Sequence, residues 1–140
     1  MKKMLFTTLI TFAIVLGLTV AGCHKANAAK IVENTDCSNV TKDNPMCTIT
    51  LKSNPTTGYA WFLISYDHDL LTLKKHQFVK PDTDLVGAPG TEEFQFEATD
   101  NALKAPHTTS VNLVYARSWE LKDPNKIKEL TPKVVQVTIK

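Results

Sequence analysis

The sequence predicts an all-β protein, built either as a sandwich of two sheets or as a barrel. Several short runs alternate apolar and polar residues with a period of two, which is typical of strands that bury one face. Proline, glycine, asparagine and aspartate cluster between these runs, and no stretch has a convincing helical period. The pattern indicates short strands packed around one core, and it does not separate a sandwich from a barrel.

The first segment is expected to be a signal peptide and not part of this fold. Two lysines precede the apolar stretch Met4–Val20, in the order that signal peptides have. Val20–Cys23 reads VAGC and resembles a bacterial lipobox, in which cleavage leaves a diacylated cysteine at the new N-terminus. An ordinary cleavage site at Ala26–Ala28 is the alternative. Both predict that the protein is exported, and the lipobox predicts removal of residues 1–22.

Cys23 is then the expected lipidation site. Residues 23–30 form a flexible tether of mostly small residues, and residues 31–140 are long enough for one domain. The expected location is the bacterial cell envelope, in the periplasm or at the cell surface, with the lipid in the membrane. The formal charge of +2 equals that of the two leader lysines, so the rest is near neutral. It has no basic patch interleaved with aromatics, so we expect no nucleic-acid partner. We also expect a monomer.

Cys37 and Cys47 are expected to form a disulfide, because exported thiols tend to pair. They bracket a turn-rich stretch, and a bridge across so short a loop would contribute about 2–3 kcal/mol. Two buried, inert thiols are the alternative. A catalytic cysteine is not expected, because no histidine lies in a recognisable partner motif.

The strands follow in order along the domain. Ala60–Ser65 is apolar throughout and is interpreted as a core strand containing a core residue, Trp61. Leu70–Leu73 and Lys75–Val79 are expected to form one bent strand or two short ones. Asp123–Leu130 has room for one short helical turn, confined by prolines. The remaining expected strands are Cys47–Leu51, Glu92–Thr99, Thr108–Ala116 and Lys133–Ile139.

Alternation assigns the faces of these strands. Phe94, Phe96 and Ala98 share one face of their strand, and the glutamates Glu92, Glu93 and Glu97 are interpreted as its solvent-exposed side. The same alternation groups Val111, Leu113 and Tyr115, and turns Val135, Val137 and Ile139 inward.

The residue inventory gives no support for an enzyme. The four histidines are scattered without metal-ligand spacing, and Asp67–Asp69 is interpreted as a solvated turn. No nucleophile elbow, phosphate loop or dinucleotide fingerprint occurs in the sequence. We therefore expect no catalytic residues, no metal and no cofactor.

One turn carries more information than the others. It lies between two expected strands, where Pro55 fixes φ and Gly58 permits a positive φ. On chemistry alone it is either a well-formed turn with no further role or a functional loop on a rigid scaffold. It matches the NPTTGY signature of the chagasin-like inhibitors of cysteine peptidases, with Asn54, Pro55, Thr56, Thr57, Gly58 and Tyr59.

Two further loops resemble that family in the same order along roughly Lys30–Lys140. One resembles its glycine-rich GxGG loop and consists of Gly87, Ala88, Pro89 and Gly90. The other resembles its RPW loop and consists of Arg117, Ser118 and Trp119. Pro89 replaces a glycine, which removes a backbone donor, and Ser118 replaces the proline, which leaves that loop less rigid.

The resemblance implies an immunoglobulin-like β-sandwich with its functional loops clustered at one end. It also implies a reversible inhibitor of papain-like cysteine proteases that occludes the active-site cleft with three loops, Thr56 lying nearest the catalytic cysteine. Trp119 would then be exposed and stack on aromatic residues of the enzyme, whereas a lone tryptophan is otherwise expected in a core. The alternative is a surface lipoprotein that binds a non-protease partner through the same sandwich.

Overall fold

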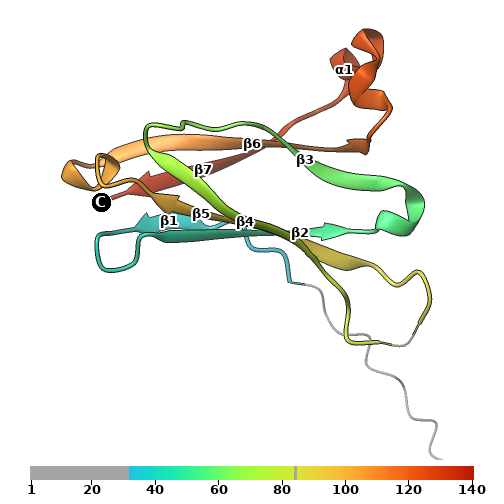
Figure 1. Ribbon diagram of the computed structural model, residues 1–140, viewed down its shortest axis with the longest axis horizontal. Helices are drawn as coiled ribbons and strands as arrows, with labels where there is room; N and C mark the ends of the chain where they lie inside the picture. Colours follow the sequence, from blue (N-terminus) through green and yellow to red (C-terminus); the bar gives the residue numbers. More distant parts are fainter. Residues whose placement is uncertain (1–31, 84) are drawn as a thin grey trace, which may run out of the picture.

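Two β-sheets face one another in the computed structural model, which describes residues 32–83 and 85–140 (Figure 1). One sheet has the strand order β1-β7-β6-β3 and the other β2-β5-β4. The strands are β1 (Cys37–Val40), β2 (Met46–Ser53), β3 (Tyr59–Ser65), β4 (Leu71–Val79), β5 (Gly90–Ala98), β6 (His107–Arg117) and β7 (Lys133–Ile139). The arrangement confirms the all-β prediction and resolves it as a sandwich and not a barrel.

Short helical turns occupy several of the connections. They are η1 (Pro55–Thr57), η2 (Ala102–Lys104), η3 (Glu120–Lys122) and α1 (Pro124–Glu129). Asp123 caps α1, because its side chain accepts a hydrogen bond from the Asn125 amide at 2.9 Å, and Pro124 stands at the first helical position. The short helix expected within Asp123–Leu130 is therefore confirmed.

The core lies between the sheets and consists of alternating residues of facing strands. β5 pairs antiparallel with both β2 and β4, and β6 pairs antiparallel with β3 and β7. The inward positions expected for β5 and β7 are all buried, and so are those of β6 apart from Tyr115, which is half-buried. The largest fully buried side chains include Ile49, Leu51, Leu71, Phe94, Phe96, Val111, Leu113, Val137 and Ile139.

The interpretation of Ala60–Ser65 as a core strand is wrong. β3 is an edge strand that pairs only with β6; its first five residues are half-buried and its last two are exposed. A continuous apolar run cannot distinguish a two-sided core strand from an edge strand with one side partly covered. Trp61 is accordingly half-buried, although it packs against the core as expected.

Glu92 also lies elsewhere than expected. It was assigned to the solvent-exposed side of its strand, but it is 4% exposed and shares the inner face of β5 with Phe94 and Phe96. Alternation alone would have placed it there, and its charge argued for the opposite face. The prediction for Glu92 is therefore wrong, whereas Glu93 and Glu97 do alternate with the buried positions.

Strand β1 was not expected, and it explains the position of the first structural cysteine. β1 pairs parallel with β7, the last strand of the chain, through Cys37 with Val137 and Val40 with Ile139. Cys37 and Cys47 form the expected disulfide, which joins β1 of one sheet to β2 of the other. Both cysteines are buried. The bridge therefore connects the two sheets covalently.

The predicted leader (residues 1–22), Cys23 and the tether (residues 23–30) lie outside the described residues. Within the part of the chain that the structure describes, no helix has the length and apolar character needed to cross a membrane.

Candidate functional site

The Asn54–Tyr59 turn, called the first loop below, connects β2 of one sheet to β3 of the other. Asn54 organises it: the Thr57 amide donates to the Asn54 carbonyl at 3.1 Å, and the Thr57 hydroxyl donates to the same oxygen at 2.6 Å. The Thr56 hydroxyl donates to Asn54 Oδ1 at 2.6 Å. Gly58 ends the turn with φ 81°, a left-handed conformation that favours glycine. The sequence thus folds into one defined 3₁₀ turn.

The Pro81–Gly90 connection, the second loop, lies beside the first. Asn54 Nδ2 donates to the Gly87 carbonyl at 3.4 Å, and a Cβ on Gly87 would lie 3.8 Å from Thr56 Oγ1. Gly87 also has a positive φ, of 78°. The second loop presents two exposed apolar side chains, Leu85 and Val86. The two loops therefore form one continuous surface.

Gly90 has a different role from the one that its sequence suggests. A glycine in this motif suggests bare backbone that a partner could approach closely. Gly90 is instead buried at the start of β5, where a Cβ would lie 2.3 Å from the Val79 carbonyl oxygen. Close packing between β4 and β5 therefore explains the glycine. Ala88 and Pro89 are half-buried beside it.

The Arg117–Trp119 turn, the third loop, lies on the other side of the first. The Arg117 amide donates to Glu120 Oε2 at 2.9 Å, which closes the turn after β6. Trp119 is 58% exposed, and a Cβ on Gly58 would lie 3.4 Å from its Cη2 atom. Its exposure excludes the alternative of a core tryptophan. Ser118 is exposed beside it.

Aromatic rings connect this surface to the interior. The Arg117 guanidinium lies 4.5 Å from the Tyr59 ring centroid and 5.5 Å from the Trp119 ring. Tyr59 stacks on Tyr115 at 5.3 Å, and Tyr115 lies 5.1 Å from the Trp61 ring. The Tyr115 hydroxyl also accepts a hydrogen bond from the Asn54 amide at 3.0 Å. The first and third loops therefore share one aromatic support, which sequence inspection did not reveal.

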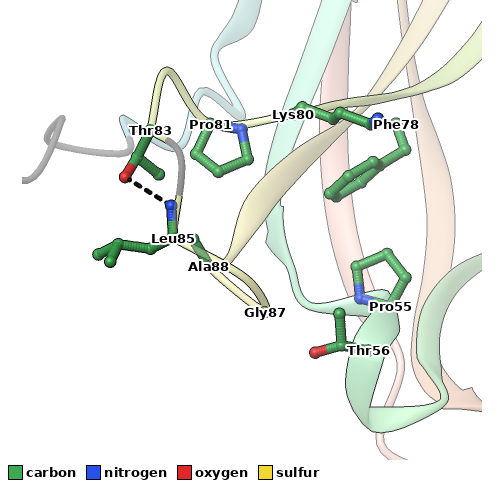
Figure 2. Close-up of a pocket in the computed structure, with 9 residues that line it drawn as sticks. All are labelled: Pro55, Thr56, Phe78, Lys80, Pro81, Thr83, Leu85, Gly87 and Ala88. Atoms are coloured by element: carbon green, nitrogen blue, oxygen red, sulfur yellow. Dashed lines mark hydrogen bonds between the residues drawn. The ribbon is translucent and has the colours of Figure 1, made fainter.

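A groove with a volume of about 340 Å³ is lined by residues of both the first and the second loop. Figure 2 shows Pro55 and Thr56 on one side of it, facing Gly87 and Ala88 of the second loop. Phe78, near the end of β4, also lines it. The groove lies among predicted binding residues, so it belongs to the same surface.

The geometry brings all three predicted loops together at one end of the sandwich. Strands of both sheets enter or leave them, so the scaffold fixes their relative positions. The surface offers exposed apolar side chains, hydroxyls and an arginine. Among the described residues, no group of histidine, cysteine and acidic side chains has the arrangement of a metal site. Aromatic side chains and arginine are residue types enriched at protein–protein interfaces.

The model of the family described as "Chagasin family peptidase inhibitor I42" matches residues 40–134, which include all three loops. The chain belongs to this family.

Two curated relatives agree with this assignment. The chain is 41% identical to chagasin of Trypanosoma cruzi over 76 residues, covering 51% of this chain and 64% of chagasin. The chain thus spans somewhat less than two thirds of the length of chagasin. It is 36% identical to amoebiasin-2 of Entamoeba histolytica over 94 residues, covering 66% of this chain and 71% of that protein.

The chain is also similar to two solved structures. The crystal structure of a cysteine protease inhibitor from Entamoeba histolytica has 25% identity and a TM-score of 0.48, covering 67% of this chain and 76% of that one. The solution structure of amebosin has 23% identity and a TM-score of 0.44, covering 67% of this chain and 77% of that one.

Membership of the chagasin family bears on several expectations. The family comprises peptidase inhibitors, which confirms the prediction that the chain is not an enzyme. The roles of the individual loop residues remain predictions, as do the lipid on Cys23 and the location in the envelope.

Proposed function

We propose that the protein is a reversible inhibitor of papain-like cysteine proteases and that its three loops fill the active-site cleft. The observation that carries this proposal is the direct contact of the first loop with both of the others, through Thr56 beside Gly87 and Gly58 beside Trp119. A central loop that contacts a second loop on one side and a third on the other forms a wedge, and papain-like enzymes carry their Cys–His pair in an open cleft. The inhibitor would block that cleft by occupying it, without a covalent reaction.

The energetics favour such docking. Exposed Trp119 beside Arg117 supplies the residue types that dominate binding at interfaces. Internal hydrogen bonds already order the first loop, so little conformational entropy is lost on association. An interface of ordinary size, on the order of 800 Å² per partner, is then sufficient for tight binding.

The internal hydrogen bonds that order the first loop also explain why the target protease would not cleave it. A protease needs the scissile carbonyl held in a near-attack geometry beside its nucleophile. The first loop is a 3₁₀ turn whose Asn54 and Pro55 carbonyls accept internal hydrogen bonds from Thr57 and Gly58. We expect mass spectrometry to find the loop intact after long incubation with active enzyme; a cut within Asn54–Tyr59 would contradict the mechanism.

Steady-state inhibition of papain by the full chain, purified in detergent, tests the proposal. We expect reversible inhibition by the natural sequence and its loss in the double variant Thr56→Arg, Trp119→Ala, with an unchanged circular dichroism spectrum. The matched control is Ile64→Ala, Val134→Ala, which removes two other exposed apolar side chains outside the three loops. Failure of the natural sequence to inhibit papain and a panel of its relatives would reject the function and favour a non-protease partner.

We also propose that Cys23 carries the lipid that anchors the inhibitor to the bacterial cell envelope. The VAGC sequence at Val20–Cys23 supports this, together with the apolar leader that precedes it. Mass spectrometry of the N-terminal peptide is expected to show a diacylated cysteine. Cys23→Ala should abolish membrane association, and an unmodified N-terminus near Ala28 would favour ordinary cleavage instead.

A further inference from the structure

A buried carboxylate lies directly beneath the first two loops. Glu92 follows the second loop by two residues and is 4% exposed, between the loop surface and the apolar core at Phe94. Burying a carboxylate is costly unless hydrogen bonds compensate for the lost water. Glu92 therefore calls for an explanation that packing alone does not give.

Three groups from three different strands contact this carboxylate. Glu92 Oε1 accepts a hydrogen bond from the Ser53 hydroxyl at 2.6 Å and another from the Trp61 amide at 3.0 Å. Glu92 Oε2 lies 2.9 Å from His76 Nε2, and the His76 side chain is 42% exposed. His76 also stacks on Phe94, its partner across the strands, with ring centroids 4.0 Å apart. Both carboxylate oxygens are thus satisfied.

The positions of these partners along the chain show which segments Glu92 connects. Ser53 is the last residue of β2, directly before Asn54, and Trp61 follows Tyr59 by two residues. One oxygen of Glu92 therefore holds both flanks of the first loop, and these flanks belong to different sheets. Glu92 and His76 belong to β5 and β4, the strands joined by the second loop.

We infer that Glu92 is the positioning residue of the inhibitory surface, because its carboxylate fixes the first loop relative to the second. The inference rests on the proposed function for its biological meaning. Charge-assisted hydrogen bonds in a water-poor site have strict geometry, whereas apolar contacts at the same place would tolerate sliding. Glu92 would thereby keep the loops in one arrangement before a protease arrives.

Substitutions at Glu92 and Ser53 test this inference in the full chain. Glu92→Met removes every hydrogen bond of the cluster, and we expect the inhibition constant for papain to rise at least about tenfold. Glu92→Gln keeps the shape, one acceptor oxygen and a donor toward His76, so it should remain within about threefold of the natural sequence. Ser53→Ala removes one bond and should fall between the two.

A variant can weaken inhibition because the whole fold is less stable or because the loops lose their fixed arrangement. A control variant must separate these two effects. Val137→Ala is the matched control, because Val137 is fully buried on β7 opposite Thr109, near the β6 end that lies farther from the third loop. It should lower the melting temperature but leave the inhibition constant of the folded protein unchanged. Equal weakening of inhibition by Val137→Ala and Glu92→Met at similar melting temperatures would overturn the inference, and so would natural affinity in Glu92→Met.

Amide hydrogen exchange in the free protein gives a second reading that needs no protease. The Thr57 and Gly58 amides close the first loop and do not contact Glu92. We expect them to exchange faster in Glu92→Met and in Ser53→Ala than in Val137→Ala. If the natural sequence inhibits no papain-like protease, the proposed function fails, and unchanged exchange of these amides would separately overturn the positioning role. Should Glu92→Met fail to fold, Ser53→Ala decides the question in both assays.

Discussion

Trp119 rests against Gly58, so that a Cβ on this glycine would lie 3.4 Å from the indole Cη2 atom. The contact joins the third loop to the first. It holds a large aromatic side chain in an exposed position, where a partner can contact it, and tryptophan is among the residue types that dominate binding at interfaces. Two predictions concern these two residues.

Trp119→Ala should weaken inhibition without weakening the fold. The side chain is 58% exposed, so its removal costs little core packing, whereas a central tryptophan of an interface is worth about 2 kcal/mol or more, or about thirtyfold in affinity. The inhibition constant for papain and the melting temperature measure the two effects. A fall in melting temperature with unchanged inhibition would show that Trp119 supports the fold instead.

Gly58→Ala should impair the site more than the fold. Its φ of 81° costs an alanine roughly 1 kcal/mol. The new methyl group would also lie 3.4 Å from Trp119 Cη2, at the short end of ordinary van der Waals contact. We expect a small loss of stability in urea denaturation and a change in the tryptophan fluorescence spectrum. Val40→Ala, which truncates a buried side chain of β1, is the control that should lose stability with little spectral change. Identical spectra for Gly58→Ala and the natural protein would contradict the contact.

Gly90→Ala, in contrast, should impair the fold more than the site. Its Cβ would lie 2.3 Å from the Val79 carbonyl oxygen and 2.6 Å from Phe78 Cζ, so the backbones of β4 and β5 must move apart. Overpacking of this kind typically costs about 1–3 kcal/mol. Urea denaturation should show a larger loss than in Gly58→Ala. Natural stability in Gly90→Ala would contradict the close packing.

Removal of the disulfide should destabilise the domain by about 2–3 kcal/mol through the chain entropy of the unfolded state. The double variant Cys37→Ala, Cys47→Ala leaves no unsatisfied polar group in the core and should unfold at lower urea concentration. A reducing agent should have the same effect on the natural protein and none on the variant. Equal stability of the reduced and oxidised forms would show that the bridge does not constrain the chain.

Much of this architecture could be predicted from local pattern. Alternation placed Phe94 and Phe96 inward, and Lys133–Ile139 was predicted with its exact bounds. The three loops stood out because turns need special residues, such as Gly58 at a positive φ. Their contact at one end followed from family resemblance, since strand pairing cannot be read from spacing alone.

The features that were predicted wrongly or not at all have a common physical cause. Each depends on contacts with residues that are distant in the sequence. β1 (Cys37–Val40) contains turn-forming residues and becomes a strand because β7 pairs with it. β3 lies at a sheet edge that its apolar sequence does not reveal. Glu92 is buried because Ser53, Trp61 and His76 approach it from elsewhere in the chain.

The disulfide between Cys37 and Cys47 also has a mechanical consequence. A pull on the N-terminal side of the domain first loads the bridge between Asn34 and Thr50 of β2, and then crosses the disulfide from Cys37 into β2. β2 leads without interruption to Asn54, so tension reaches the first loop through covalent bonds and the ladder that β2 shares with β5. The covalent path through the disulfide bypasses the stretch between the two cysteines. An inhibitor held at its N-terminal side by a surface and at its loops by an enzyme would therefore resist being drawn out of shape.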